Sequence, residues 1–423
     1  MKHLAGIALW FVASPLWAES WLVAPGPDAE AALQEALIVA QPGDEVVLAP
    51  GRFDISNQIS LANEDVTLRG AGMDQSVLSF KGQTGGAEGV IVTANGAILK
   101  DFAVEDTKGD AIKVKGVDGI AIIRVRVEWT NGPDAANGSY GFYPVESRNV
   151  LLDGVVAIGA SDAGIYVGQS QKIIVRNSRA EFNVAGLEIE NCYFVDVFDN
   201  ILTKNTGGLL VFDLPDLPQQ GGHDIRFFGN KSFANNTANF APEGNIVGMV
   251  PAGTGMLIMA NADVEVFGNE FSDNRTVGII IASYVKDTED PNYNISPRRI
   301  HVHDNAFKAN GGDPDDSEFG GLLRELFGAA VPQIVWDGVM PLWRWATVGA
   351  TADEQHSIHD NDFGDLVPYG NADFIGKFGL TWLHEVSYDI SEHSATLAPL
   401  AAVQVIIRGR DVSHPGAWGE MEK

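Results

Sequence analysis

Three features that often define a protein's class are scarce in this chain: cysteine, basic charge and long apolar runs. Cys192 is the single cysteine among 423 residues, so no disulfide can form within the chain. Lys and Arg total 28 against 56 Asp and Glu, which gives a formal net charge of −28. A surface of this sign repels nucleic acid and anionic membranes, and it also disfavours unassisted binding of acidic polysaccharides.

The apolar run nearest the N-terminus has the features of a targeting segment. Residues 4–12 follow Lys2 and His3, and the small residue Ala18 ends the following stretch. This pattern is typical of a secretory signal, which predicts cleavage after Ala18 and a periplasmic or secreted protein. The run is too short to span a bilayer and no later stretch is long enough, so we expect no membrane insertion.

A Gly followed by alternating apolar residues recurs about every 22 or 23 residues. The spacings between successive copies are 23, 22, 22, 47 and 23 residues, so the long one spans two periods with one weak copy. A period this short, built from alternating strands and turn residues, fits one turn of a parallel β-solenoid. Such turns must stack, because none can bury its inner face alone. The copies begin at Gly141, Gly164, Gly186, Gly208, Gly255 and Gly278.

A second apolar pattern in the same repeat ends in Asn. Val195 and Val197 precede Asn200, and equivalent strings end in Asn230, Asn269 and Asn305. Stacked Asn side chains can hydrogen-bond along the solenoid axis, and Asn tolerates the left-handed backbone of sharp corners. These Asn residues are therefore predicted to be structural.

These repeats resemble the right-handed parallel β-helix superfamily, which includes pectate lyases, mannuronan C5-epimerases and the β-helix protein that assists copper loading of nitrous oxide reductase. The resemblance implies an all-β fold, a single-stranded right-handed parallel β-helix of about eleven coils with an N-terminal capping helix. The amphipathic segment 31–37, followed by residues 42–51, is similar to the helix that caps the first coil in this superfamily. The chain also resembles secreted bacterial parallel β-helix repeat proteins of unassigned activity, whose genes tend to lie beside one for a second exported protein.

The same resemblance sets the expected division of the chain. We predict a signal peptide at 1–18, the capping helix within 19–45, the parallel β-helix at 46–310, an insertion covering one face at 311–350, and a last coil with an irregular C-terminal region at 351–423.

Outward positions on the Gly-initiated strands form a stripe whose first half is polar and aromatic. Polysaccharide enzymes with this fold usually place their catalytic groups there, and lyase or epimerase chemistry needs a base, a charge neutraliser and an acid within hydrogen-bond reach. Lysine or arginine could neutralise a carboxylate, and tyrosine could exchange a proton. The candidate catalytic residues are Lys113, Tyr143, Tyr166 and Glu188, and the candidate substrate-binding residues are Lys115, Glu146, Arg148 and Glu190.

Residues 140–146 resemble an epimerase motif but depart from it at two positions. The motif reads Tyr-Gly-Phe-Asp-Pro-His-Glu, whereas Tyr143 takes the Asp position here and Val145 the His position, so the usual base is missing. Several functions therefore stay open: a groove that binds a polysaccharide or oligosaccharide, a lyase or epimerase, and a surface without a ligand. The alternative from another class is a non-catalytic periplasmic scaffold for an exported protein partner, with a connection to metal.

The second half of the stripe is apolar and predicts a cover. Residues 311–350 interrupt the repeat with a short helix that begins after Ser317, followed by several large apolar residues. This excursion is the expected cover or, alternatively, a functional lid or a docking surface. The apolar stripe consists of Leu210, Phe212, Leu257, Met259 and Ile280, and the large apolar residues of the excursion are Trp336, Met340, Leu342, Trp343 and Trp345.

A further column follows the second strands: Phe198, Phe228, Phe267, His303 and His359. Neighbouring coils lie about 4.8 Å apart, so the two imidazoles could meet and hold zinc or copper, with His301 and His356 nearby. An aromatic ladder that ends in His explains the column equally well. The acidic segments 287–290 and 313–316 offer oxygen ligands for calcium, although solvated charge explains them too.

Overall fold

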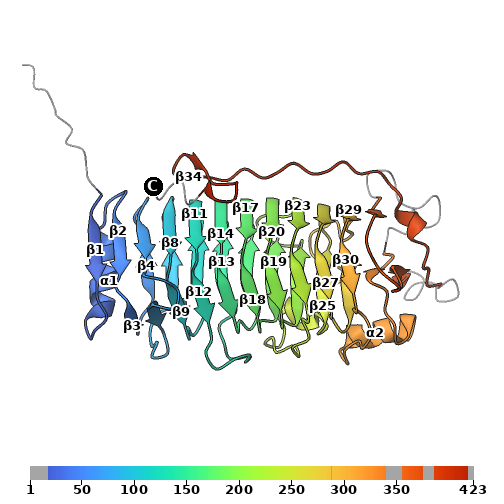
Figure 1. The fold of residues 1–423 in the computed structure, drawn as a ribbon, viewed down its shortest axis with the longest axis horizontal. Coiled ribbons are helices and arrows are strands. Elements are labelled where there is room, and N and C mark those ends of the chain that lie inside the picture. Colours follow the sequence, from blue (N-terminus) through green and yellow to red (C-terminus); the bar gives the residue numbers. More distant parts are fainter. Residues whose placement is uncertain (1–17, 287, 340–354, 375–384, 418–423) are drawn as a thin grey trace, which may run out of the picture.

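The computed structural model describes residues 18–286, 288–339, 355–374 and 385–417. Within them, three long parallel sheets run along the molecule, and successive turns of the chain add strands to each sheet (Figure 1). We call them sheets A, B and C. Residues 1–17 of the predicted signal peptide, 1–18, lie outside the described residues, so the cleavage site stays a prediction.

Sheet A has twelve strands. In spatial order they are β1 (Ser20–Val23), β2 (Glu45–Leu48), β5 (Thr67–Arg69), β8 (Ala97–Lys100), β11 (Asp118–Ile123), β14 (Arg148–Asp153), β17 (Gln171–Arg176), β20 (Tyr193–Phe198), β23 (His223–Phe228), β26 (Ala262–Phe267), β29 (Arg298–His303) and β32 (Ser357–His359).

Sheet B has ten strands and sheet C eleven. Sheet B contains β3 (Gly51–Asp54), β6 (Ser76–Ser79), β9 (Ala103–Glu105), β12 (Arg126–Glu128), β15 (Val156–Ile158), β18 (Arg179–Glu181), β21 (Ile201–Thr203), β24 (Lys231–Phe233), β27 (Glu270–Ser272) and β30 (Ala306–Lys308). Sheet C contains β4 (Ile59–Leu61), β7 (Val90–Val92), β10 (Ile112–Lys115), β13 (Tyr140–Val145), β16 (Ala163–Gly168), β19 (Ala185–Glu190), β22 (Gly207–Phe212), β25 (Thr254–Met259), β28 (Val277–Ala282), β31 (Ile334–Trp336) and β33 (Tyr369–Asn371).

The core lies inside the solenoid and follows the predicted alternation. Ile165, Leu187 and Leu209 occupy paired positions on β16, β19 and β22, and each is fully buried. Val167, Ile189 and Val211 form the next buried column in the same way. The predicted register is therefore confirmed for these strands, and it turns the side chains of the alternate positions outward.

The predicted Asn ladder is confirmed, with one correction to its backbone. Asn200 donates from Nδ2 to Oδ1 of Asn230 at 3.0 Å, and the chain continues through Asn269 and Asn305 at 2.9 Å per step. The left-handed residue at each corner is the one before the Asn, such as Asp304 with φ 53°. A second ladder, absent from the sequence-based prediction, joins Asn183, Asn205, Asn235, Asn274 and Asn310.

Helix α1 (Ala29–Val39) lies at the N-terminal end of the stack, as expected for a cap (Figure 1). Its Leu33 and Leu37 are buried and belong to the main core. Strand β1 precedes the helix and pairs with β2, which the sequence pattern did not indicate. No described helix has both the length and the apolar character that a membrane crossing requires.

Helix α2 (Glu318–Phe327) covers only part of the predicted apolar stripe. Its cap is as predicted, since Ser317 Oγ accepts from the Gly320 amide at 3.1 Å. Leu323 of the helix packs with Ile280, and Leu257 lies at the edge of the same group. The prediction that this excursion covers the whole stripe is therefore wrong for the other three stripe residues. Leu210, Phe212 and Met259 pack instead against Leu214, Val247 and Val250 of other loops, including the short 3-10 helix η1 (Ile246–Met249).

The solenoid also continues past residue 310. Trp336, predicted as part of the cover, ends β31 and pairs with β28 and β33 of sheet C. The reason is that Ile334–Trp336 is an apolar segment that can extend the sheet at its open edge. Met340, Leu342, Trp343 and Trp345 lie outside the described residues.

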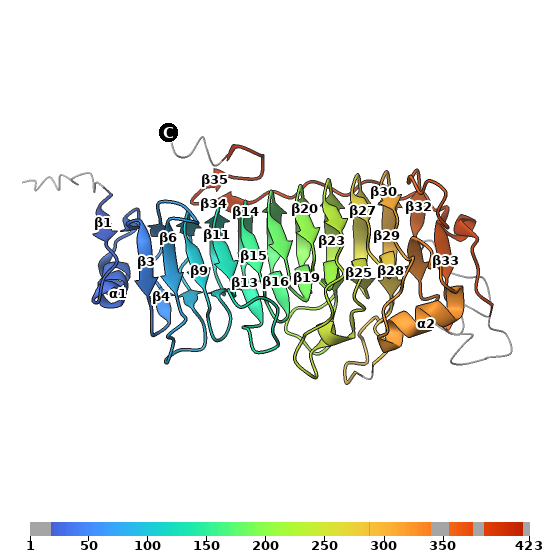
Figure 2. The same ribbon diagram turned by 60° about the horizontal axis from the view of Figure 1, so that its bottom comes forward.

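A C-terminal strap, residues 394–413, runs back along the outside of sheet A (Figures 1 and 2). It follows the 3-10 helix η3 (Ile390–His393) and contains the antiparallel pair β34 (Ile406–Ile407) and β35 (Arg410–Asp411). Val403, Val405 and Ile407 of the strap pack on outward side chains of sheet A such as Leu151 and Ile174. The region predicted to be irregular therefore covers an apolar outer face.

Candidate functional site

Four strands of sheet C carry the four predicted catalytic residues at neighbouring positions. Lys113 on β10 pairs with Tyr143 on β13, and Tyr166 on β16 pairs with Glu188 on β19. All four point to the same outer face because each occupies an outward position on successive coils. With Tyr140, Asp162 and Glu190 they form what we call the tyrosine–carboxyl cluster.

Three tyrosine rings pack against one another at the centre of this cluster. Ring centroids of Tyr140 lie 4.5 Å from Tyr143 and 4.6 Å from Tyr166, and those of Tyr143 and Tyr166 are 5.0 Å apart. Tyr166 is buried and donates its hydroxyl to Glu190 Oε1 at 2.7 Å, whereas Tyr140 and Tyr143 are half-buried. Tyr140 was not among the predicted site residues, although it begins the motif that indicated the site.

The charge of Lys113 is already compensated by neighbouring carboxylates. Its Nζ lies 3.0 Å from Glu88 Oε1 and 3.6 Å from Asp110 Oδ2, and 4.9 Å from the centre of the Tyr143 ring. Burial alone would lower the pKa of Lys113, but Glu88 and Asp110 raise it. The predicted role of Lys113 as a neutraliser of a substrate carboxylate is therefore opposed by two carboxylates of the protein itself.

Glu188 is not a groove residue. Only 2% of its surface is exposed, and burial raises its pKa well above the ordinary value for a glutamic acid. The cause is its position between Tyr166 and Leu210, in the part of sheet C that the loop around Val247 and Val250 covers. The sequence pattern correctly predicted that Glu188 points outward, but it did not indicate that this loop covers the residue.

Two further carboxyl groups share this low-polarity surrounding. Burial and the charge of Glu190 raise the pKa of Asp162 to about 7, and burial raises the pKa of Glu190 to about 6. Asp162 accepts a hydrogen bond from Asn245 Nδ2 at 2.9 Å, so the covering loop contacts the cluster directly. Asp162 could have been suspected from its place just before β16. Each of these groups therefore keeps its proton to a higher pH than an ordinary carboxyl group does.

The remaining predicted substrate-binding residues lie at the margin of this face or beyond it. Lys115 and Glu146 are exposed and pair at 3.6 Å between Nζ and Oε1. Arg148 is exposed and begins β14 of sheet A, so it follows the corner after sheet C and does not join the tyrosines.

The predicted aromatic column is confirmed on the outside of sheet A. Rings of Phe198, Phe228, Phe267, His303 and His359 stack with centroid separations of 4.7, 5.0, 5.3 and 5.4 Å in chain order, and their planes lie within 11° of parallel. The ladder thus places two imidazoles side by side at its C-terminal end.

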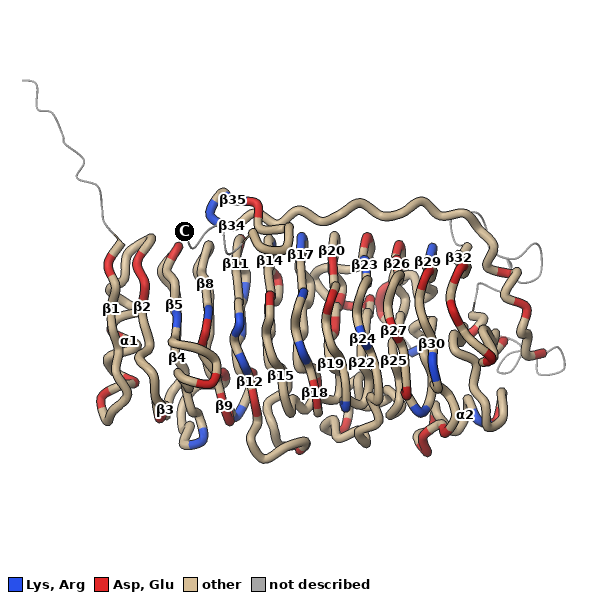
Figure 3. The backbone as a smooth tube through the Cα atoms, viewed as in Figure 1, with Lys and Arg blue, Asp and Glu red and all other residues tan. Residues whose placement is uncertain are grey.

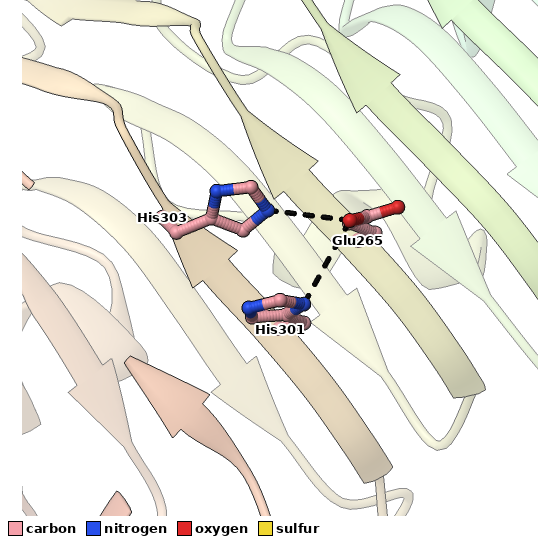
Figure 4. A group of neighbouring side chains, drawn as sticks. All are labelled: Glu265, His301 and His303. Carbon is pink, nitrogen blue, oxygen red and sulfur yellow. Dashed lines mark hydrogen bonds and ion pairs between the residues drawn. The ribbon is translucent and has the colours of Figure 1, made fainter. Parts of the chain in front are cut away.

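Glu265, His301 and His303 lie together on the outside of sheet A (Figure 4). With His359, which contacts His301, we call them the histidine cluster. His303 Nε2 and His301 Nδ1 lie 3.2 and 3.7 Å from the same oxygen, Glu265 Oε1. His301 Nε2 lies 3.0 Å from His359 Nε2. Burial and the neighbouring His303 lower the pKa of His301 to about 4. Glu265 was absent from the prediction, although the pairing of β26 with β29 sets it directly beside His301.

His356 belongs to a different group. Its Nδ1 accepts from the Ile300 amide at 3.2 Å, and its ring lies 5.3 Å from that of His393. Both are buried near Trp336, so they contribute to the packing at the C-terminal end of the solenoid.

The acidic segment 313–316 uses its carboxylates for contacts within the protein. Asp315 Oδ2 accepts from the Ala252 amide at 2.8 Å, and Asp316 pairs with Arg324 at 3.1 Å. Asp287 of the other segment lies outside the described residues. Calcium binding stays a prediction.

The fold and the comparisons with known proteins agree on the class. A family model described as right handed beta helix region matches residues 70–216. The A-module of the mannuronan C-5 epimerase AlgE4 from Azotobacter vinelandii has the same fold, with a TM-score of 0.57, 16% identity and coverage of 83% of this chain and 97% of that one. The chain is therefore an all-β solenoid, and its fold is that of the right-handed parallel β-helix superfamily.

Two other solved structures are less similar to this fold. The A-module of the epimerase AlgE6 from the same organism gives a TM-score of 0.43 at 15% identity, covering 80% of this chain and 92% of that one. The pectate lyase Pel9A gives 0.39 at 13% identity, covering 82% and 78%. No curated protein matches the chain in sequence.

Proposed function

We propose that this protein binds a neutral glycan on the outer face of sheet C. The observation that carries this proposal is the tyrosine–carboxyl cluster, in which two half-buried tyrosines lie beside carboxyl groups whose pKa values are raised to about 6 and about 7. Aromatic rings suit the apolar faces of sugars, and hydroxyl and carboxyl groups suit sugar hydroxyls.

The charges of the site favour a neutral glycan over a polyuronate. Lys113 already pairs with Glu88 and Asp110, and the formal charge of the chain is −28. An acidic polysaccharide would meet repulsion unless a cation such as calcium bridged it. Fold similarity to an epimerase does not change this argument, because function depends on the site and not on the fold.

The same groups favour proton donation over proton abstraction. The positions that hold Asp and His in the epimerase motif hold Tyr143 and Val145, so the usual base of that motif is missing. Glu190, in contrast, is half-buried with a pKa raised to about 6, which suits a general acid near neutral pH. If the bound glycan is modified, hydrolysis of a glycosidic bond is the reaction these residues serve best.

A panel of neutral and uronate polysaccharides tests the proposal by measuring binding, new reducing ends and unsaturated products. Because Tyr166 and Glu188 are buried, the informative substitutions are Tyr143→Ala and Glu190→Gln. We expect each to weaken glycan binding at least about tenfold, equivalent to roughly 1.4 kcal/mol. The exposed Tyr388→Ala is the matched control and should bind like the wild type. Absence of binding by the wild type, or equal binding by all variants, would overturn the proposal.

The scaffold alternative has lost its supporting observation. It required Leu210, Phe212 and Ile280 to be free for a partner, but loops and α2 of this chain bury them. An exported protein partner and export itself remain predictions from the sequence.

A further inference from the structure

We propose that Glu265, His301 and His303 form a binding site for a divalent transition metal ion of the zinc class. The three residues come from neighbouring strands β26 and β29 of sheet A, and their donor atoms lie within 4.8 Å of one another. The site lies on a different sheet from the proposed glycan face and does not depend on it. Imidazole nitrogen together with a carboxylate is a donor set that zinc favours.

The hydrogen bonds around the cluster fix which nitrogen atoms carry lone pairs. His303 Nδ1 lies 2.7 Å from Asp304 Oδ2, and His359 Nδ1 lies 2.9 Å from Asp360 Oδ2. A carboxylate can only accept, so in the neutral imidazoles these Nδ1 atoms carry the hydrogen and both Nε2 atoms carry lone pairs. His301 Nε2, 3.0 Å from His359 Nε2, must then be the donor, which leaves a lone pair on His301 Nδ1.

Three acceptors consequently point at one place. His301 Nδ1 is buried and has no hydrogen-bond partner among the described residues, and it faces Glu265 Oε1 together with His303 Nε2 (Figure 4). Leaving buried acceptors opposed to one another costs free energy unless something positive lies among them. A metal ion satisfies all three at once, whereas a proton on His303 satisfies only the pair that it bridges.

The separations fit a small tetrahedral ion. Ligands at about 2.0–2.1 Å from zinc lie roughly 3.3 Å from one another. The two donor-to-donor distances to Glu265 Oε1 are 3.2 Å from His303 Nε2 and 3.7 Å from His301 Nδ1. The donor atoms of His301 and His303 lie within 4.8 Å of each other, so the two imidazoles would rotate toward each other to admit the ion.

Surrounding contacts hold the ligands in place. The Leu400 amide of the C-terminal strap donates to Glu265 Oε2 at 3.0 Å, which directs Oε1 toward the histidines. Asp304 orients His303, and His359 orients His301, as outer partners do at zinc sites. This changes the sequence-based prediction, in which His303 and His359 were the ligands. His359 is instead a positioning residue, because its Nε2 contacts Nε2 of His301, the nitrogen that faces away from Glu265.

Zinc titration of the chelator-stripped full chain tests the site. We expect one Zn²⁺ per chain in competition with a chromophoric indicator, and Co²⁺ at the same site should give the visible absorption of a low-coordinate nitrogen-ligated ion. His303→Ala and Glu265→Gln should weaken binding by more than about 100-fold, and Asp304→Asn by about 10–100-fold. Circular dichroism of each variant checks folding, and two independent ligand variants keep the test valid if one fails to fold.

His223→Ala is the matched control. His223 also contacts the next residue through Nδ1, at 2.7 Å from Asp224 Oδ2, but it belongs to no described group of metal-ligand side chains. Its removal should leave zinc affinity unchanged. Binding of less than one Zn²⁺ per chain by the wild type, or equal affinity in the wild type and both ligand variants, would show instead that a proton shared by His303 and Glu265 satisfies the cluster.

Discussion

The tyrosine–carboxyl cluster of sheet C and the histidine cluster of sheet A are built in the same way and differ in how their polar atoms are satisfied. Both take outward side chains from successive coils, which the stacking spaces at about one strand separation. In the first cluster, the Tyr166 hydroxyl donates to Glu190, and Glu188 Oε2 is the carboxyl oxygen left without a hydrogen-bond partner among the described residues. In the second, acceptors on His301, His303 and Glu265 face one another.

Covering segments account for much of this difference. The loop around Asn245 and Val250 packs over part of the tyrosine–carboxyl cluster, where burial raises the pKa of Asp162 and the hydrogen bond from Asn245 lowers it by a smaller amount. The strap reaches the histidine cluster with one backbone amide, from Leu400, and leaves His303 partly exposed. Acidic residues occur along the whole solenoid (Figure 3), so local cover and not overall charge distinguishes the two places.

The largest effect should come from breaking the stack on which both clusters depend. Leu187→Asp places a charge in the fully buried core beneath the tyrosines and should destabilise the fold by at least several kcal/mol, roughly 5. Chemical denaturation and soluble yield measure this. Leu22→Asp makes the same change at a side chain that is 72% exposed and should be tolerated. Unchanged unfolding of Leu187→Asp would mean that the register is wrong.

The covers can be compared by truncating one side chain in each. Leu323→Ala in α2 should cost about 2–5 kcal/mol, because Leu323 is fully buried against the sheet. Val250→Ala, above the tyrosine–carboxyl cluster, removes less volume and should cost about 1–2 kcal/mol while also lowering the raised pKa of Asp162. Thermal unfolding and carboxyl titration by NMR report the two effects, with exposed Ile38→Ala as the control. An equal titration of Asp162 in all three variants would contradict the role assigned to the loop.

The smallest effect concerns pH. Burial raises the pKa of Asp162 from 3.8 to about 7, so between these values the folded state binds more protons than the unfolded state. Stability from this group is therefore lost as pH rises through that window. Asp162→Asn removes the penalty and should gain stability over the wild type between pH 5 and pH 8, by at most roughly 4 kcal/mol and by less if Glu190 shares the proton.

Melting temperatures of the wild type and Asp162→Asn across this pH range measure the difference. Asp134→Asn, at an exposed position, should follow the wild type throughout. A constant difference between Asp162→Asn and the wild type would show that Asp162 does not titrate in this window.

Regular spacing made much of the molecule predictable. The 22- or 23-residue repeat was sufficient for the parallel solenoid, the inward column through Leu187 and the ladder through Asn200, because stacking repeats one local geometry. It also aligned Lys113, Tyr143 and Tyr166 on one face and placed His303 beside His359. Each of these statements needed only the position of a residue within its own repeat.

The sequence by itself thus determined the fold, the direction of each side chain on the repeats and the residue types that gather on each face. Tertiary structure decided which of those faces stay open. In the folded chain a loop covers Glu188, and Glu88 forms an ion pair with Lys113. Trp336 extends sheet C, and the Leu400 amide contacts Glu265, which lies 135 residues away in the sequence. The physical reason is that loops and the strap follow no repeat, so their contacts depend on packing between distant segments, and burial, and with it the pKa of a side chain, depends on those contacts.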